Sequence, residues 1–335
     1  MIKTLDTRSE ELNLLTSYAN GKRPVKIFSG RANIQLATEI CKHLNLQLGK
    51  VKIAPFADGE LYVQIQESVR GCDIFLIQST CTPVNENIME LLILIDALKR
   101  ASAEKITVVI PYYGYGRQDR KAAGREPITS KLVADLISRA GADRVLAVDL
   151  HATQIMGFFD ILVDHLFATP VLVDYINSLN LKDVVVVSPD VGGVTRARAF
   201  AKKLNDVPIA IIDKRRAHDK QNYVEVLHII GDVENKTCIL VDDMIDSAGT
   251  ICKGAELLVK KGAKDVLACC THPIMSGPAK DRLDNSPISQ VIVTNSVPVP
   301  PERATTKLKV LSVAGLLAEA IKRIHLDDSV SEMFE

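Results

Sequence analysis

The chain has 335 residues, enough for two domains of ordinary size with a core each, and its 47% hydrophobic and 24% charged residues exclude a disordered or fibrous protein. Its 41 basic residues balance 41 acidic ones, so no general electrostatic attraction to nucleic acid or to an anionic membrane is expected. No apolar run approaches the ~20 residues that span a bilayer.

Short β-branched runs alternate with helical patterns along the chain, which predicts parallel sheets joined by crossover helices. The predicted strands are residues 25–28, 73–78, 106–110, 145–148, 184–187, 209–212, 238–241, 266–270 and 290–293. The predicted helices are residues 87–100, 130–139, 194–204 and 250–261. Several strands are almost wholly apolar, as strands covered on both faces should be. The predicted fold class is therefore α/β, with mainly parallel sheets flanked by helices.

The order of elements over residues 25–110 occurs again over residues 184–270. In both regions two strands are followed by a loop, a helix that ends in basic residues and a further strand. We therefore predict two related domains, residues 1–167 and 168–335, with the last residues packing back on the first domain.

The seven cysteines contain no CxxC pair and no Cys/His spacing for zinc, and several lie in apolar strand-like runs. Reduced, mostly buried thiols are expected. The first residues also lack the apolar core of a signal peptide. Together these features predict a cytoplasmic protein, with neither nucleic acid nor membrane among its partners.

The strand predicted at residues 238–241 is followed by two adjacent carboxylates, Asp242 and Asp243. Open α/β sheets bind ligands at the carboxyl ends of their strands. The next loop, residues 246–250, precedes a helix, and backbone N–H groups at a helix N-terminus suit a phosphate. A sugar phosphate would satisfy both features, with its hydroxyls on the acids and its phosphate on the loop. The alternative is that these residues only cap the helix.

Other polar residues also follow predicted strands. Asp149 and His151 are two apart and project to one side, which fits a divalent ion or its waters, although a hydrogen-bonded structural pair has the same pattern. Residues 111–126 form a basic, glycine-containing loop that either binds a ligand or is a solvated surface loop. Residues 213–216 (Asp-Lys-Arg-Arg) are either site cations or a solvated face.

Taken together, these motifs resemble one known family. They are Arg117-Gln118-Asp119, Asp149-Leu150-His151, Gly157-Phe158-Phe159-Asp160, Ser188-Pro189-Asp190-Val191-Gly192-Gly193, Lys214-Arg215-Arg216 and the loop of residues 242–250. Their order and spacing closely resemble the ribose-phosphate pyrophosphokinases (phosphoribosyl pyrophosphate synthetases) of the phosphate-dependent bacterial and plant-plastid type, which have the phosphoribosyltransferase fold. The resemblance runs from about Val25 to the final residues.

The resemblance implies an enzyme that transfers the diphosphoryl group of Mg-ATP to the 1-hydroxyl of ribose 5-phosphate. The products would be AMP and phosphoribosyl pyrophosphate for nucleotide, histidine and tryptophan biosynthesis. It implies Lys214 and Arg216 as catalytic cations and His151 and Asp190 as ligands of Mg2+. It also implies that ribose 5-phosphate is bound by Asp190, Asp242, Asp243, Asp246, Ser247, Ala248, Gly249 and Thr250, and ATP by Arg117 and Gln118 with Phe56, Asp58 and Glu60 of a neighbouring subunit.

The resemblance further implies a homohexamer that phosphate activates and ADP inhibits, at an interface site matched in part by Ser68, Arg70 and Thr153. Met156 stands where many relatives have a Gln, and a thioether lacks the donors of an amide. Ala123 replaces a basic residue of the mobile loop at residues 117–126, and the segment at 217–222 is longer than usual. These departures bear on the regulatory response, on the ATP affinity and on loop closure.

Three rival functions share parts of this pattern. A nucleobase phosphoribosyltransferase would share the sugar-phosphate loop but would need neither two related halves nor Asp149-x-His151. A non-catalytic regulatory homologue would be expected to have lost catalytic residues, whereas Lys214, Arg216 and His151 are all present. A DNA-binding regulator on the same fold is disfavoured by the neutral net charge.

Overall fold

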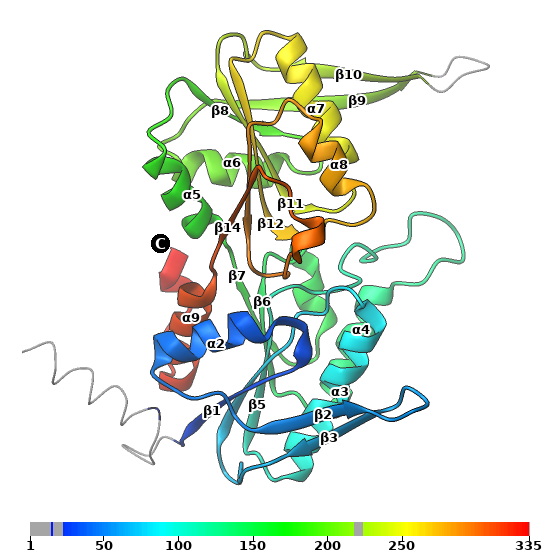
Figure 1. The fold of residues 1–335 in the computed structure, drawn as a ribbon, viewed down its shortest axis with the longest axis vertical. Coiled ribbons are helices and arrows are strands. Elements are labelled where there is room, and N and C mark those ends of the chain that lie inside the picture. The colour runs from blue at the N-terminus through cyan, green and yellow to red at the C-terminus, as the bar shows by residue number, and fades with distance from the viewer. Residues whose placement is uncertain (1–14, 16–22, 218–223, 335) are drawn as a thin grey trace, which may run out of the picture. The chain divides into compact units, whose positions relative to one another are not determined.

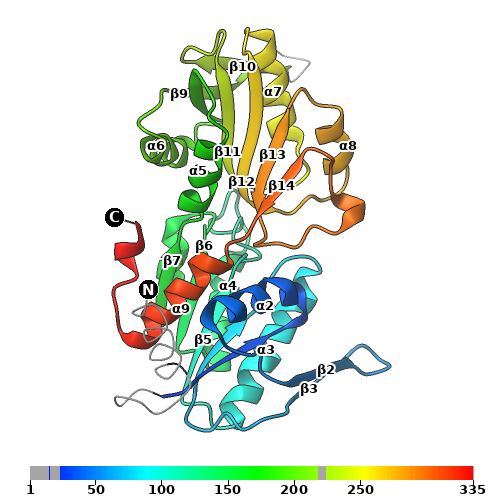
Figure 2. The ribbon, with the colours of Figure 1, turned by 60° about the vertical axis from the view of Figure 1, so that its left-hand side comes forward.

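The computed structural model describes Leu15 and residues 23–217 and 224–334, except for the side chains of residues 214–217 and 224–227. The chain divides into two compact units. Unit 1 consists of Met1–Phe167 with Val313–Glu335, and unit 2 consists of Ala168–Ser312. Each unit has its own sheet, its own flanking helices and its own hydrophobic core (Figures 1 and 2).

Unit 1 is built on a parallel sheet with the strand order β1-β4-β5-β6-β7. These strands are β1 (Val25–Ser29), β4 (Asp73–Ile77), β5 (Lys105–Ile110), β6 (Arg144–Val148) and β7 (Leu162–Leu166). Its α-helices are α2 (Ile34–Leu44), α3 (Val84–Arg100), α4 (Thr129–Ala140) and α9 (Ala314–Leu326), and its 3-10 helices are η2 (Arg31–Asn33), η3 (Thr153–Phe158) and η5 (Ser331–Phe334). An antiparallel hairpin of β2 (Val51–Pro55) and β3 (Leu61–Ile65) projects from this unit (Figure 2).

Unit 2 is built on a larger sheet with the strand order β10-β9-β8-β11-β12-β13-β14. Its strands are β8 (Val184–Ser188), β9 (Ile209–Ala217), β10 (Val224–Ile230), β11 (Thr237–Ile245), β12 (Asp265–Pro273), β13 (Gln290–Thr294) and β14 (Leu308–Leu311). Its helices are α5 (Thr169–Ser178), α6 (Val194–Lys203), α7 (Gly249–Lys260), α8 (Ala279–Asp284) and the 3-10 helix η4 (Pro301–Arg303). Every strand pair is parallel except β9 with β10.

The two sheets repeat one topology. In unit 1, β1 is bordered by β4, and β5, β6 and β7 follow outward in chain order. In unit 2, β8 is bordered by β11, and β12, β13 and β14 follow in the same way. The correspondence of β1 with β8 and of β4 with β11 is the one that the sequence repeat predicted. The predicted α/β class with mainly parallel, helix-flanked sheets is confirmed.

All nine predicted strands are present, but β2, β3, β7, β10 and β14 were not predicted. The strands β2 and β3 alternate between half-buried and exposed residues, so they lack the continuous apolar run of a strand covered on both faces. The strands β7, β10 and β14 form sheet edges. Polar residues such as Asp164 and Lys309 interrupt their apolar runs, because an edge strand is covered less completely.

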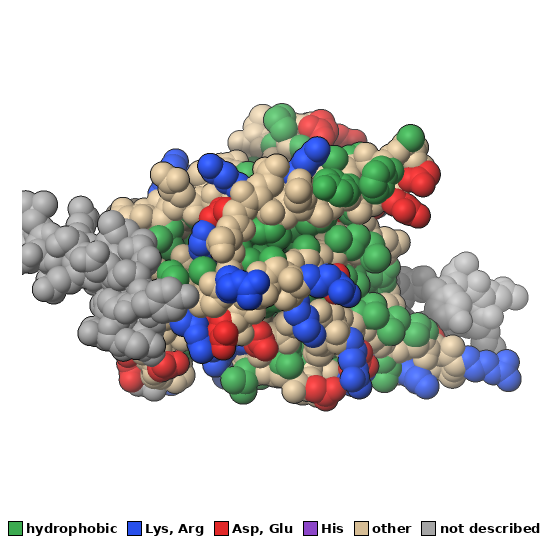
Figure 3. Space-filling model, turned by 90° about the horizontal axis from the view of Figure 1, so that it is seen from below, with side chains coloured by type: hydrophobic (Ala, Val, Ile, Leu, Met, Phe, Trp, Pro, Cys, Tyr) green, Lys and Arg blue, Asp and Glu red, His purple; other side chains and the backbone are tan. Residues whose placement is uncertain are grey.

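The apolar strands supply the cores. In unit 1, Leu76 of β4 packs in one cluster with Leu91 and Leu94 of α3, all fully buried, and in unit 2 Leu240 of β11 packs in a cluster with Ala255 of α7. All seven cysteines are buried and free, as predicted. On the face seen in Figure 3, basic and acidic side chains are interspersed, which agrees with the balanced net charge. Among the described residues, no helix is long and apolar enough to cross a membrane.

The C-terminal helix α9 belongs to unit 1 and packs against α2 (Figure 2). Near its end the buried ring of His325 lies with Nδ1 2.9 Å from Asp73 Oδ2, at the first residue of β4. On α2, Ile40 is fully buried whereas Ile34 is half exposed. The helix α2 therefore buries one apolar face, and it packs against both β1 and α9.

Replacing Ile40 with Ala is expected to lower the free energy of unfolding by about 2–5 kcal/mol, because the deletion leaves a cavity in a closed core. The matched control is Ile34→Ala on the same helix, for which a change of about 0.5 kcal/mol or less is expected. Denaturant unfolding followed by circular dichroism measures both values. Equal losses in the two variants would contradict this packing of α2.

Candidate functional site

The acidic pair of unit 2 lies inside β11 rather than after it. The strand continues to Ile245, so the predicted strand end at Val241 is wrong. Its pairing with β8 stops at Leu240, whereas its pairing with β12 continues and places Asp242 opposite Cys270. The longer partner β12 extends the strand, and the acids lie where β8 has already ended. They are therefore at the carboxyl end of the sheet, where a ligand is expected.

One cation serves both acids. Arg196 of α6 has its Nη1 3.2 Å from Asp242 Oδ1 and 3.5 Å from Asp243 Oδ1. Burial, followed by the adjacent Asp243 carboxylate, raises the pKa of Asp242 to about 7, and Arg196 opposes this shift. The pair is therefore only partly ionised near neutral pH in the absence of a ligand. Sequence reasoning missed Arg196, although its place in the first turn of the helix after the Ser188–Gly193 turn was an available signal.

A third carboxylate reaches the same sheet edge from the turn that follows the neighbouring strand β8. Asp190 is exposed, and its Oδ1 accepts a hydrogen bond from the Gly193 N–H at 2.9 Å. The Ser188 hydroxyl donates to the Asp190 carbonyl oxygen at 2.7 Å. A Cβ on Gly193 would lie 2.9 Å from Ser188 Oγ, so this tight turn requires the glycine. The turn holds the Asp190 carboxylate in place at the end of the strand beside β11.

The loop between β11 and α7 has the features of a phosphate site. Ser247 and Thr250 are exposed, and Ala248 has a left-handed backbone (φ 59°) with its methyl group buried in the core. For an L-residue this conformation costs roughly 1–2 kcal/mol, and such strain is concentrated at functional sites. The N-cap residue of α7 is Ala248, which makes no side-chain capping hydrogen bond, and this counts against the alternative that these residues only cap the helix.

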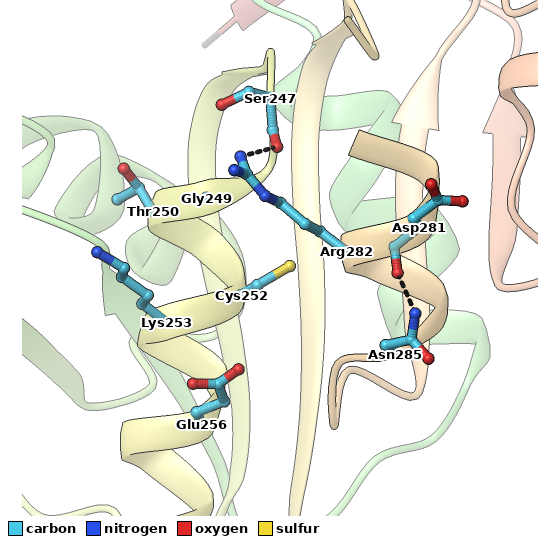
Figure 4. Close-up of a pocket in the computed structure, with 9 residues that line it drawn as sticks. All are labelled: Ser247, Gly249, Thr250, Cys252, Lys253, Glu256, Asp281, Arg282 and Asn285. Carbon is cyan, nitrogen blue, oxygen red and sulfur yellow. Dashed lines mark hydrogen bonds between the residues drawn. The ribbon is translucent and has the colours of Figure 1, made fainter. Parts of the chain in front are cut away.

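The loop borders a groove of about 660 Å³ between α7 and α8 (Figure 4). The groove is lined by Ser247, Gly249, Thr250, Cys252, Lys253, Glu256, Asp281, Arg282 and Asn285. Arg282 points from α8 toward the loop and donates from Nη1 to the Ser247 carbonyl oxygen at 2.9 Å (Figure 4). Asp246 is turned toward the segment after β12, where its carboxylate accepts a hydrogen bond from the Ser276 hydroxyl. Neither Arg282 nor Ser276 was a sequence candidate.

The cations Lys214 and Arg216 lie in β9, which continues to Ala217, so the predicted strand end at Ile212 is wrong. The backbone pairs Lys214 with Leu227 and Arg216 with Glu225 of the antiparallel strand β10. Antiparallel pairing carries the strand past the predicted end. The side chains of both cations lie outside the described residues, and so does most of the longer segment predicted at residues 217–222.

In unit 1, the predicted ATP residues Arg117 and Gln118 follow β5 and are exposed. Gln118 is tied to the start of α4, where its Oε1 accepts a hydrogen bond from the Thr129 hydroxyl at 2.5 Å. His151 follows β6 and is also exposed, and a Cβ on Gly116 would lie 3.6 Å from His151 Cβ. The structure therefore brings the start of the 117–126 loop close to His151.

The predicted adenine contacts Phe56, Asp58 and Glu60 are brought together by the β2–β3 turn. The Phe56 N–H donates to the Glu60 carbonyl at 2.7 Å, and the Glu60 N–H donates to Asp58 Oδ1 at 3.1 Å. All three residues are exposed, including the Phe56 ring at 55%. An aromatic ring and two carboxylates presented to solvent form a surface that a ligand or partner can contact.

The three predicted regulatory residues lie on two segments of unit 1. Ser68 and Arg70 are in the connection from β3 to β4, and Thr153 begins η3. Arg70 and Thr153 are exposed. Within one chain these residues are therefore presented by two different surface segments.

At the position in unit 1 that matches the acidic pair, a buried network fills the sheet edge. Gln78 is fully buried, and its Oε1 accepts from the Ala32 N–H at 3.2 Å while its Nε2 donates to Glu90 Oε1 at 3.1 Å. Glu90 also accepts from Arg31 Nε at 2.6 Å. A Cβ on Gly30 would lie 2.4 Å from Gln78 Oε1. The network leaves no room there for a sugar phosphate.

The Mg2+ ion predicted at His151 and Asp190 requires suitable donor atoms among the residues there. Among the described residues there is no cluster of three or more His, Cys, Asp or Glu that could hold a metal ion. Mg2+ usually binds through one or two carboxylates and completes its shell with water and substrate phosphates. The exposed Asp190 carboxylate, with one oxygen already oriented by Gly193, fits that mode of binding.

Comparison with known proteins gives concordant matches. Residues 25–141 match the model of the N-terminal domain of ribose phosphate pyrophosphokinase, and residues 219–335 match that of the phosphoribosyl synthetase-associated domain. The chain is 61% identical over 312 residues to ribose-phosphate pyrophosphokinase of Synechococcus elongatus, covering 92% of this chain and 93% of the relative. It is 57% identical over 334 residues to ribose-phosphate pyrophosphokinase 1, chloroplastic, of Arabidopsis thaliana, covering 99% and 82%. The crystal structure of phosphoribosylpyrophosphate synthetase from Mycobacterium smegmatis matches with a TM-score of 0.85 at 46% identity, covering 90% of this chain and 99% of that one.

The raised pKa of Asp242 makes stability depend on pH. Between the ordinary carboxyl pKa of about 4 and the folded value of about 7, the folded protein keeps a proton that the unfolded chain releases, so stability falls as pH rises through this range. Asp242→Asn removes this titration. Without ligand, the Tm of the variant minus that of the parent should therefore increase between about pH 5 and about pH 8.

Thermal unfolding measured across this pH range tests the expectation. The matched control is Asp174→Asn, at an exposed position of α5, for which no such trend is expected. A difference in Tm that is constant with pH, or that decreases toward pH 8, would contradict the raised pKa.

Proposed function

This chain belongs to the ribose-phosphate pyrophosphokinase family, and on that basis we propose the roles of its residues in diphosphoryl transfer. The enzyme transfers the diphosphoryl group of ATP to the 1-hydroxyl of ribose 5-phosphate and forms phosphoribosyl pyrophosphate and AMP. The hydroxyl oxygen attacks the β-phosphorus, the bond from this phosphorus to the oxygen of the α-phosphate breaks, and AMP leaves. The proton of the 1-hydroxyl is released to water.

One observation carries the assignment of the sugar site: the carboxyl end of β11 presents two acids, and the loop that follows it opens α7. Carboxylates accept hydrogen bonds from sugar hydroxyls, whereas N–H groups and hydroxyls at a helix N-terminus bind a phosphate. Ribose 5-phosphate carries both chemical groups. We propose that Asp242, Asp243 and Asp190 receive the ribose hydroxyls. The phosphate would be bound by the loop from Asp246 to Thr250.

The phosphate end of the site has exposed hydroxyls at Ser247 and Thr250 and the first backbone N–H groups of α7. A phosphate there gains from the helix dipole and from hydrogen bonds to the N–H groups. The contribution of Asp246 differs from that of the other loop residues. Its carboxylate already accepts from Ser276, so we assign its backbone rather than its side chain to the ligand.

For ATP we propose Arg117 and Gln118, with Phe56, Asp58 and Glu60 contributed by a neighbouring subunit. Support comes from the exposure of all five residues and from the hairpin turn that groups the last three. Lys214 and Arg216 are proposed to stabilise the charge that develops on the transferred group and on the departing AMP. Phosphoryl-type transfers depend mainly on such positioning and electrostatic stabilisation.

Mg2+ coordination by His151 and Asp190 stays a prediction. When bound, the ion would neutralise part of the polyphosphate charge. Asp190 would supply an oxygen ligand, held by its hydrogen bond from Gly193, and the substrate phosphates and water would complete the shell. Removal of divalent ions with a chelator is therefore expected to abolish turnover.

We further propose that the enzyme self-associates, as a homohexamer in the family pattern, with phosphate and ADP as effectors. Apolar side chains such as Phe56, Met89 and Leu132 are more than half exposed, which supports contact with further subunits. The cytoplasmic location also stays a prediction, since the relatives include a protein named as chloroplastic.

The function is tested by the release of AMP from ATP and magnesium, with and without ribose 5-phosphate, at low and at high phosphate. We expect AMP only when ribose 5-phosphate is present, because its hydroxyl is the acceptor. A response to phosphate would show whether Met156 has altered regulation. Binding of ribose 5-phosphate without release of AMP at any phosphate level would indicate a non-catalytic member. The absence of both binding and AMP release would contradict the function.

Lys214→Ala is expected to lower kcat by ~10²–10³-fold. Removal of one donor that stabilises transition-state charge in other enzymes lowers kcat by a similar factor. The matched control is Lys202→Ala, an exposed lysine of α6 in the same unit, which should leave kcat unchanged. Steady-state kinetics with both substrates saturating measures the effect. A loss below about tenfold would remove Lys214 from the catalytic role.

A further inference from the structure

The segment that follows β12 holds the phosphate loop by its carbonyl groups. The Met275 N–H donates to the Ile245 carbonyl and the Ser276 N–H to the Asp246 carbonyl, each at 3.0 Å. Arg282 continues the series from α8, with Nη1 2.9 Å from the Ser247 carbonyl oxygen (Figure 4). Carbonyls of three successive residues, 245 to 247, are therefore directed toward one neighbouring segment.

These bonds set the direction of the N–H groups of the loop. In a planar trans peptide the carbonyl and the following N–H point to opposite sides. The bond from Ser276 to the Asp246 carbonyl therefore directs the Ser247 N–H away from the segment after β12. The bond from Arg282 to the Ser247 carbonyl directs the Ala248 N–H away in the same manner. Successive N–H groups turned to one side form an anion-binding concavity.

We propose that Arg282 is a positioning residue for ribose 5-phosphate, which presets the phosphate loop by holding the Ser247 carbonyl. This inference rests on the proposed assignment of the loop to the phosphate group. With that carbonyl fixed, the Ala248 N–H faces the ligand before the ligand binds. A Ser247 carbonyl that turned round would present its negative end to the phosphate and remove a donor.

Strain in the loop explains why an anchor is needed at this peptide. Ala248 comes directly after the held carbonyl and has the left-handed backbone, which costs roughly 1–2 kcal/mol for an alanine. Without the anchor the 247–248 peptide can rotate and relieve this strain. The hydrogen bond from Arg282 therefore lies at the peptide whose rotation would relieve the backbone strain at Ala248.

The local packing leaves the guanidinium a defined place. A Cβ on Gly249 would lie 3.2 Å from Arg282 Nη1, so the glycine allows the arginine to approach the start of α7. The helix α8 is itself fixed, because Ala279 and Leu283 are fully buried in the core of unit 2. Arg282 thus extends from an anchored helix to the strained turn.

The first test is calorimetric titration of ribose 5-phosphate into the full-length protein and into Arg282→Met, a neutral variant of similar length. Loss of one hydrogen bond from a charged donor should weaken binding about tenfold. The KM for ribose 5-phosphate should rise by a similar factor, while kcat and the KM for ATP stay within about threefold. The loss should persist in about 1 M KCl, where charges are screened within ~3 Å, because the contact is local.

Arg282→Lys and Arg198→Met complete the set. The lysine retains one donor and should recover part of the affinity, whereas Arg198→Met removes an exposed arginine of α6 and should bind like the parent. Hydrogen–deuterium exchange without ligand gives an independent result. The peptide covering residues 245–250 should exchange faster in Arg282→Met than in the parent, and Arg282→Lys should show a smaller increase. The exchange rate in the core of β11 should stay unchanged.

The outcomes distinguish the assignment of the loop to the phosphate from the positioning role of Arg282. If the parent does not bind ribose 5-phosphate, the loop assignment fails and the role of Arg282 fails with it. If the parent binds and Arg282→Met binds equally well, only the positioning role is overturned. A loss that disappears in high salt, with unchanged exchange at residues 245–250, also overturns it, since Arg282 would then act by long-range charge.

Discussion

Two carboxylates share one cation at the carboxyl end of β11, and the sugar site that we propose for unit 2 is arranged around this partly buried charge. Asp242 and Asp243 are adjacent on one strand, and Arg196 lies within 3.5 Å of both. Bringing two acids together out of water is unfavourable, and it raises the pKa of Asp242 to about 7. In the proposed complex, the hydroxyls of the sugar would donate hydrogen bonds to these acids. The electrostatic free energy of the acidic pair is therefore least favourable without a ligand, and this would favour binding.

The phosphate loop shows the same relation between local cost and function. Ala248 adopts a left-handed backbone, and its buried methyl group and the neighbouring carbonyl contacts keep it there. The energy that maintains this strained turn comes from the packing of unit 2, from the segment after β12 and from Arg282 of α8. A loop held in this way would lose less conformational freedom on binding the proposed phosphate, and preorganisation of this kind raises affinity.

The two units place different residues at the same point of one topology. Both place a strand end and a following helix at the same point of the sheet. In unit 2 this point carries the acids and an open loop. In unit 1 it carries Gln78, whose amide is fully buried and hydrogen-bonded to Glu90. A neutral amide with its partners inside the protein occupies the space that a ligand would need, so the same architecture becomes a structural element.

The sequence alone determined the α/β class, nine of the strands and the repeat, and it supplied the candidate site residues. Those features depend on local composition: apolar runs mark strands buried on both faces, and polar residues that follow them mark ligand-binding edges. Only the tertiary structure decided the edge strands β7, β10 and β14, the continuation of β11 to Ile245 and of β9 to Ala217, and the contacts of Arg196, Ser276 and Arg282. Each of these depends on a partner distant in the chain. A strand ends where its neighbour stops offering hydrogen bonds, and an arginine acquires a function only from the carbonyl or carboxylate that folding places beside it.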